Sequence, residues 1–184
     1  MKKLALSVFI CFGLISCGSD DQQIIVPTVM DNLQAEHNRI QKIFAEINPQ
    51  EVITIVETID ADMDSALKLC QQSKSMLSPE DGTFFGRYQA LRTGVKKFDT
   101  RYEIIKSELA NTGIQLANLK ASIQGKKLDP EAIKKHTITE KIALEKLTQA
   151  IEEMHASAVY VRANYSEYRP QFLEKLKALS NHKK

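Results

Sequence analysis

Residues 91–124 read LRTGVKKFDTRYEIIKSELANTGIQLANLKASIQ, and their apolar positions recur in steps that alternate between four and three. This is the spacing of a helix that packs along one face, whereas a strand would alternate with a period of two. We therefore expect one continuous helix over about 84–124, ended by Gly125. The expected buried positions are Leu91, Val95, Phe98, Tyr102, Ile105, Leu109, Thr112, Leu116, Leu119 and Ile123.

The segment before this one, residues 28–77, has the same periodicity. Thr28 is a suitable N-cap for it, and Asn48-Pro49 is expected to end one helix and restart the next. The expected core positions in its second part are Val52, Val56, Ile59, Met63, Ala66, Cys70 and Leu77.

The segment after it, residues 129–179, starts with Asp129-Pro130, a capping residue followed by a proline. Pro170 is expected to kink this third helix near its end. Its expected core positions are Ile133, Thr137, Glu140, Leu144, Leu147, Ile151, Met154, Ala158, Val161, Tyr165, Tyr168 and Phe172.

The short links at 78–82 and 126–129 require consecutive segments to run antiparallel. We therefore expect an all-α fold, an up-down-up three-helix bundle with coiled-coil-like packing. Four helices result if the chain reverses at Asn48-Pro49. The composition agrees, because 7 Gly and 5 Pro in 184 residues are few for a β-sandwich or barrel.

The chain begins with Lys2 and Lys3, followed by an apolar run, which is typical of an export signal. The run ends in Leu14-Ile15-Ser16-Cys17, which resembles the lipobox of bacterial lipoproteins. The resemblance implies cleavage after Ser16 and lipid attachment to Cys17. The expected organisation is a signal peptide over 1–16, a lipidated tether over 17–27 and a helical domain over 28–184. An ordinary secretory signal, with Cys17 incidental, is the alternative.

The residues after Cys17 bear on which membrane would carry the protein. Gly18 stands where inner-membrane lipoproteins commonly have Asp. The Ser19-Asp20-Asp21 run resembles the acidic tether by which some Gram-negative bacteria place lipoproteins on the cell surface. These resemblances imply an outer-membrane lipoprotein, periplasmic or surface-exposed, although a short acidic run is also compatible with a solvated linker.

Charge and motifs argue against several functional classes. The net charge of +2 is too small to favour nucleic acid as a partner. No HExxH, Gly-x-Ser-x-Gly, phosphate loop or paired CxxC motif occurs in the sequence. His136 and Glu140 share a helix face, but a metal site needs three or four ligands. We therefore expect no enzyme activity, no metal and no cofactor apart from the lipid on Cys17.

If consecutive segments fold back on each other at the two links, three positions that interrupt the apolar pattern lie at the same height along the bundle. These are Pro49, Thr112-Gly113 and Thr137/Glu140, and together they would form a polar, hydrated layer. An enzyme with a site at this layer near Glu140 is the less favoured functional hypothesis.

The same folding back gathers aromatic residues at the end of the bundle opposite to the tether. Tyr suits such an end because its ring can be buried while its hydroxyl reaches water. Core packing is the simpler explanation for these residues. The candidate partner-binding residues are Phe84, Phe85, Tyr88, Tyr165 and Tyr168.

A resemblance to small helical envelope lipoproteins implies a wall-binding, stress or assembly role. The expected function is thus a membrane-tethered interaction module with a protein or cell-wall partner, and a structural spacer is the alternative. A second copy of the chain, giving a homo-oligomer, is an alternative partner.

Overall fold

The computed structural model describes residues 22–73 and 77–181, which form helices joined by short links. In chain order these are α1 (Gln22–Ala45), α2 (Pro49–Ser73), α3 (Pro79–Ala90), the 3-10 helix η1 (Leu91–Val95), α4 (Phe98–Gln124) and α5 (Pro130–Asn181). No strand occurs within the two described ranges. The expected all-α class is therefore confirmed for this part of the chain.

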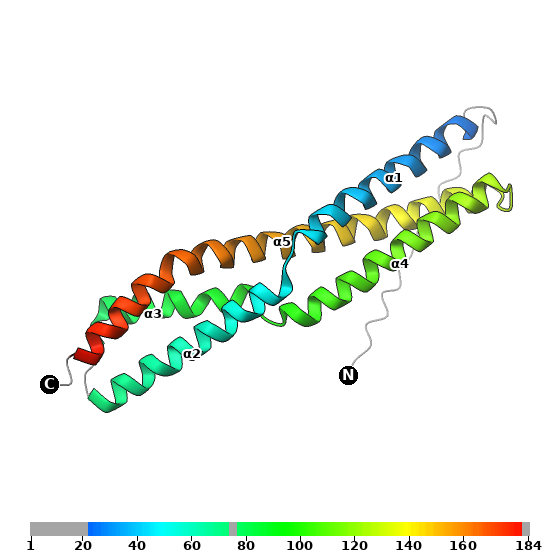
Figure 1. Ribbon diagram of the computed structural model, residues 1–184. Helices are drawn as coiled ribbons and strands as arrows, with labels where there is room; N and C mark the ends of the chain where they lie inside the picture. The colour runs from blue at the N-terminus through cyan, green and yellow to red at the C-terminus, as the bar shows by residue number, and fades with distance from the viewer. Residues whose placement is uncertain (1–21, 74–76, 182–184) are drawn as a thin grey trace.

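Helix α5 is the element against which all the others pack. It contains 52 residues, which corresponds to about 78 Å at a rise of 1.5 Å per residue. Helices α1 and α4 lie against its N-terminal half, and α2, α3 and η1 lie against its C-terminal half (Figure 1). The molecule is therefore an elongated rod with α5 running through its length.

The break between α1 and α2 lies where the sequence predicts it. The backbone N–H of Glu51 donates a hydrogen bond of 3.2 Å to the side-chain oxygen of Asn48, and Pro49 is the first residue of α2. A proline fits this position because the first turn of a helix does not use its N–H groups. The expected restart at Asn48-Pro49 is confirmed.

The expectation of one continuous helix over 84–124 is wrong. Helix α3 ends at Ala90, η1 follows, and α4 begins only after Lys97, which has a left-handed backbone with φ of 55°. Thr93 and Gly94 lie in η1 and are weak helix formers, which accounts for the tighter turn. The burial pattern nevertheless holds across the break, since Leu91, Val95 and Phe98 are all buried.

Replacing Lys97 by Gly is expected to stabilise the fold. A side chain costs free energy in the left-handed region, whereas glycine adopts it without strain. We expect Lys97→Gly to gain about 1 kcal/mol, or roughly 2–4 °C in melting temperature. The matched control is Lys96→Gly, because Lys96 has φ of −59° and gains nothing from glycine. Equal effects of the two substitutions on thermal unfolding would contradict the left-handed assignment.

Other helix ends differ in detail from the expectation. Helix α1 begins at Gln22, so Thr28 lies inside it and is not its N-cap, and α2 ends at Ser73, before Leu77. Helix α4 ends at Gln124 as expected, but the left-handed residue that follows is Lys126, with φ of 51°, and not Gly125. Its turn is closed by hydrogen bonds such as that from Lys127 N–H to the Ser122 carbonyl, 3.0 Å long.

Helix α5 starts and continues as its sequence suggests. The side chain of Asp129 accepts a 2.7 Å hydrogen bond from the N–H of Ala132, so the expected cap is confirmed. The helix continues through Pro170 to Asn181. Its C-terminal third, which contains Pro170, bends away from the line of the rest (Figure 1).

The core is a continuous apolar seam along the rod, and most of the expected positions belong to it. In α2 the buried residue is Ile55 and not Val56, and Cys70, Thr137 and Glu140 are only half-buried. The segment of α1 and the link that follows it adds buried residues that were not assigned from the sequence. These are Met30, Leu33, Ile40 and Phe44 in α1 and Ile47 in the link.

The expected shared polar layer does not form. The ring of Phe44 stacks on that of Tyr102 with centroids 4.6 Å apart, and the ring of His37 lies against Leu109 and Gly113. Pro49 follows Phe44 along the chain and therefore lies beyond Tyr102, away from Thr112. Asp62 contacts Tyr88, so the first two segments fold back on each other about position 75, midway between these residues, and not about the centre of the link at 78–82.

A smaller polar cluster lies between α1 and α4 instead. His37 is 6% exposed and Thr112 is 4% exposed. The Nε2–H group of His37 donates a 3.0 Å hydrogen bond to the carbonyl oxygen of Leu109. A Cβ atom built on Gly113 would lie 3.0 Å from Cε1 and 3.1 Å from Nε2 of this ring. Glycine at 113 is therefore what allows the imidazole to approach the α4 backbone.

Candidate interaction surface at the aromatic end

The structure brings the five aromatic candidates together at one end of the rod. Helix α3 supplies Phe84, Phe85 and Tyr88, and α5 supplies Tyr165 and Tyr168. The ring of Phe84 meets that of Tyr168 edge-on with centroids 6.0 Å apart, and Tyr88 stacks on Tyr165 at 6.4 Å. The grouping expected from the sequence is therefore found between α3 and α5.

Phe172 is the residue that joins this aromatic cluster to the core. It is fully buried, and its ring centroid lies 4.9 Å from that of Phe85 and 4.6 Å from that of Tyr88. Phe85 and Tyr88 are 3% and 0% exposed. These two candidates cannot contact a partner directly, because the packing of α3 on α5 covers them. Phe84, Tyr165 and Tyr168 are half-buried and keep part of their surface in solvent.

A polar network fixes the position of Tyr88. Its hydroxyl donates a 2.7 Å hydrogen bond to Asp62 on α2, and the Nε of Arg169 lies 3.4 Å from the same carboxylate oxygen. The Arg169 guanidinium also lies over the ring of Tyr165, 5.7 Å from its centroid. Burial, reinforced by the neighbouring Asp62 carboxylate, raises the pKa of Tyr88 well above its ordinary value. The hydroxyl therefore remains a hydrogen-bond donor and ties α2 to the cluster.

One groove next to the cluster lies between α3 and α5. Its volume is about 410 Å³, and it is lined by Glu80, Thr83, Phe84, Arg87, Gln171 and Lys175. The Nζ of Lys175 lies 2.6 Å from Asp81 and 5.3 Å from the centroid of the Phe84 ring. The hydrogen bond from Lys175, together with that from Ser78, holds the pKa of Asp81 below its ordinary value. The groove thus offers an aromatic face between charged groups of both signs.

A second groove lies between α2 and α5. Its volume is about 440 Å³, and it is lined by Asn48, Gln50, Glu51, Thr54, Ile55, Arg162, Tyr165 and Ser166. Arg162 pairs with Glu51 across it at 2.8 Å. Phe84 and Tyr165 therefore each reach a separate groove, one on either side of the aromatic cluster. Both grooves combine charged or polar side chains with part of an aromatic ring.

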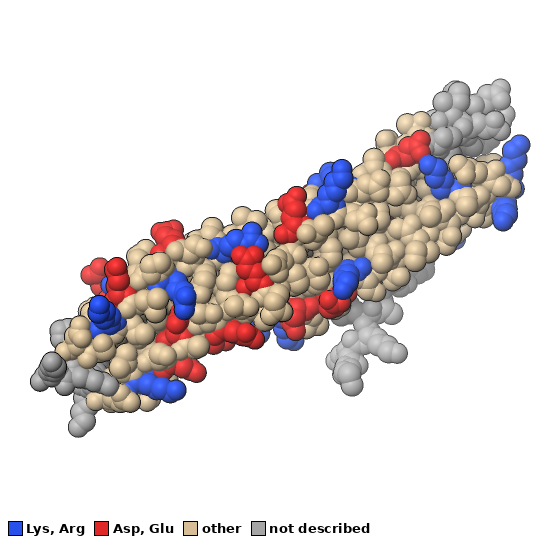
Figure 2. All heavy atoms as spheres, in the orientation of Figure 1, with Lys and Arg blue, Asp and Glu red and all other residues tan. Residues whose placement is uncertain are grey.

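Ion pairs that no sequence motif indicated connect the α1 segment to α5 and connect α2 to η1. Arg39 pairs with Glu152 at 2.7 Å, and Glu46 approaches the imidazole of His155 at 3.3 Å. Asp60 pairs with Arg92 of η1. Between Lys42 and Lys68 the chain has six acidic residues and no Lys or Arg, and acidic side chains gather over α2 in Figure 2. This one-sided charge is the signal that could have revealed where α2 meets basic residues.

The expectations for the signal peptide and the tether lie outside the described residues. Cys17, the lipobox and the Ser19-Asp20-Asp21 run precede residue 22. Within 22–73 and 77–181, no cluster of three or more His, Cys, Asp or Glu side chains could hold a metal ion. Across the same ranges, no helix has both the length and the apolar character that spanning a bilayer requires.

Comparisons of this chain with protein-family models, with characterised proteins and with solved structures give no match.

Proposed function

We propose that this chain is a non-catalytic lipoprotein of a bacterial cell envelope, anchored in the outer membrane through Cys17. In this proposal it is an interaction module for a protein or cell-wall partner. The observation that carries the proposal is the lipobox resemblance of Leu14-Ile15-Ser16-Cys17, placed five residues before α1 begins at Gln22. A lipid on Cys17 would therefore hold the start of the rod close to the bilayer.

In this proposal the chain is an up-down-up three-helix bundle with coiled-coil-like packing. Two ion pairs support it, Arg39–Glu152 and Glu51–Arg162. Going from the first pair to the second, the residue number increases both on the α1–α2 segment and on α5. Segments that run parallel to each other show this relation. Two contacts support an antiparallel middle segment: the ion pair of Asp31 with Lys120 and the hydrogen bond of Asp62 with Tyr88. From the first contact to the second, the residue number increases on the α1–α2 segment and decreases on the middle segment. A reversal of the chain at Asn48 would break the first relation.

The same arrangement makes the aromatic end the part of the rod farthest from the membrane. The end of α4 lies beside the start of α1, and α3 lies toward the opposite end of the rod (Figure 1). Lys127 follows α4 and Tyr88 belongs to α3. We expect a label at position 127 to lie closer to the bilayer than a label near Tyr88. Electron-spin or fluorescence distances on the lipidated protein in vesicles measure this. Equal distances would mean that the rod lies flat and would rule out this orientation.

The groove between α3 and α5 is the proposed contact surface for the partner. It exposes Phe84 together with Arg87 and Lys175, and an interface core rich in aromatic and arginine side chains binds proteins well. A photo-crosslinking residue in place of Thr83 or Gln171, two exposed positions of this groove, is expected to give adducts in intact cells. The matched control is Asn118, which is exposed on α4 far from the groove. Equal adducts at all three positions would contradict the proposed surface.

Two other functions remain as alternatives, and each makes a different prediction. A structural spacer would give no specific adduct at the groove and would tolerate Arg87→Glu without loss of function. An enzyme with a site near Glu140 depended on the shared polar layer, and Pro49 and Thr112 do not lie together. The interaction module is therefore the function that we favour.

A further inference from the structure

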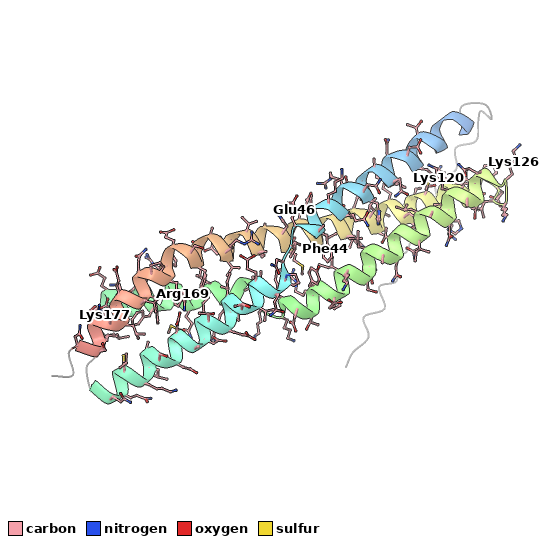
Figure 3. All side chains as sticks on the ribbon, viewed as in Figure 1. Phe44, Glu46, Lys120, Lys126, Arg169 and Lys177 are labelled. Carbon is pink, nitrogen blue, oxygen red and sulfur yellow. The ribbon has the colours of Figure 1, made fainter. Side chains whose placement is uncertain are left out.

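A group of lysines lies at the end of the rod where α4 turns into α5. Lys126 and Lys127 lie in the turn, and Figure 3 shows Lys126 at the tip of the rod, directed away from it. Lys134 and Lys135 are exposed on the first turns of α5. Among the described residues none of these four forms an ion pair, whereas the nearby Lys120 and Lys141 pair with Asp31 and Glu145. The four lysines therefore present their charge to solvent.

Two isoleucines lie on the same face of α5 as Lys134 and Lys135. Ile138 and Ile142 are 46% and 44% exposed and are one helical turn apart. Lys134 precedes Ile138 by one turn, and Lys135 precedes Ile142 by two, so a period of 3.6 residues brings all four to one face. Aliphatic side chains that reach solvent beside lysines can enter the boundary of a bilayer while the lysine ammonium groups stay at the headgroups.

The acidic residues nearby leave the excess of positive charge in place. Residues 126–146 contain six lysines and four acidic residues. Of the four, Asp129 accepts the capping hydrogen bond from Ala132 and Glu145 pairs with Lys141.

The position of this surface in the chain indicates what it contacts. Helix α1 starts at the same end of the rod, and Lys120 on α4 reaches Asp31 on α1 at 3.0 Å. The five residue steps from Cys17 to Gln22 span at most about 18 Å when extended. A lipid on Cys17 would therefore bring the lysines and isoleucines to the headgroup region of the same bilayer.

We infer that Lys126, Lys127, Lys134, Lys135, Ile138 and Ile142 form a membrane-contact surface for anionic phospholipids. The lysines bind headgroup phosphates, and the isoleucines enter the boundary with the acyl chains. The contact inclines the rod and adds a second attachment to the lipid anchor. This inference rests on the lipid anchor of the proposed function.

The test uses the lipidated protein in vesicles of neutral lipid or of neutral lipid mixed with phosphatidylglycerol. A fluorophore is attached at Ile142→Cys in a Cys70→Ser background, and quenching by brominated lipids reports contact with the bilayer. The control position is Ile114→Cys, which is 60% exposed on α4. We expect strong quenching at 142 in anionic vesicles, weak quenching at 114, and loss of the signal at 142 when the four lysines are changed to Gln.

Equal quenching at positions 142 and 114 would overturn the inference. The inference would also be overturned if quenching at 142 depended neither on phosphatidylglycerol nor on the four lysines. Mass spectrometry of the same sample shows whether Cys17 carries lipid. A lipid-free Cys17 would refute the proposed anchor, whereas a lipidated protein without contact at 142 would refute only the membrane-contact surface.

Discussion

Phe172→Ala is expected to destabilise the protein by about 3–5 kcal/mol, because it empties the centre of the aromatic cluster. Phe172 is fully buried and its ring lies against those of Phe85 and Tyr88. Removing it leaves a cavity between α3 and α5, and α3 is the shortest of the α-helices in the described part. Urea unfolding followed by circular dichroism measures the loss.

The neighbouring residue provides a matched control for this substitution. Leu173 is 42% exposed, and Leu173→Ala is expected to change the free energy of unfolding by less than about 1 kcal/mol. Similar losses for the two variants would mean that Phe172 is not the centre of the aromatic end. The contact surface proposed between α3 and α5 would then lack its support.

Gly113→Ala is expected to cost about 1–3 kcal/mol, although alanine usually stabilises a helix interior relative to glycine. The reason is the His37 ring, whose Cε1 atom would lie 3.0 Å from the new Cβ. The ring is buried and is held by its hydrogen bond to the Leu109 carbonyl. Moving the ring aside by a few tenths of an ångström would strain that bond and the packing around the buried ring.

Two further variants separate this steric effect from helix propensity. Gly86→Ala on α3 meets no atom within 4 Å and is expected to gain about 0.5–1 kcal/mol. Gly113→Ala in a His37→Ala background is expected to lose most of its cost, since the ring is gone. If Gly113→Ala stabilises the protein as Gly86→Ala does, His37 does not pack against α4 as described.

The sequence predicts the helical class and most of the core because both depend on a repeating pattern. The restart at Asn48-Pro49 and the cap at Asp129 were also predictable, since each has a local signature. The break at Lys97 was not, because a lysine in the left-handed region looks like any other lysine in the sequence. The same holds for Lys126.

Residues that act across helices were the hardest to predict. The partner of His37 is a backbone carbonyl, which leaves no trace in the sequence. The aromatic cluster was predicted because rings recur at helical spacing on two segments joined by a link of known length. The sequence did not reveal that Phe85 and Tyr88 are buried while Phe84 and Tyr165 reach the grooves, since all four follow similar periodicity.

The central claim is that Cys17 anchors this rod in a membrane, and mass spectrometry of the mature N-terminus tests it most directly. We expect a diacylglyceryl-modified cysteine at position 17, and an unprocessed precursor when Cys17 is changed to Ala. The control is Cys70→Ser, a variant of a residue half-buried on α2, which is expected to be processed normally. A cleaved, lipid-free product that begins at another residue would contradict the proposal.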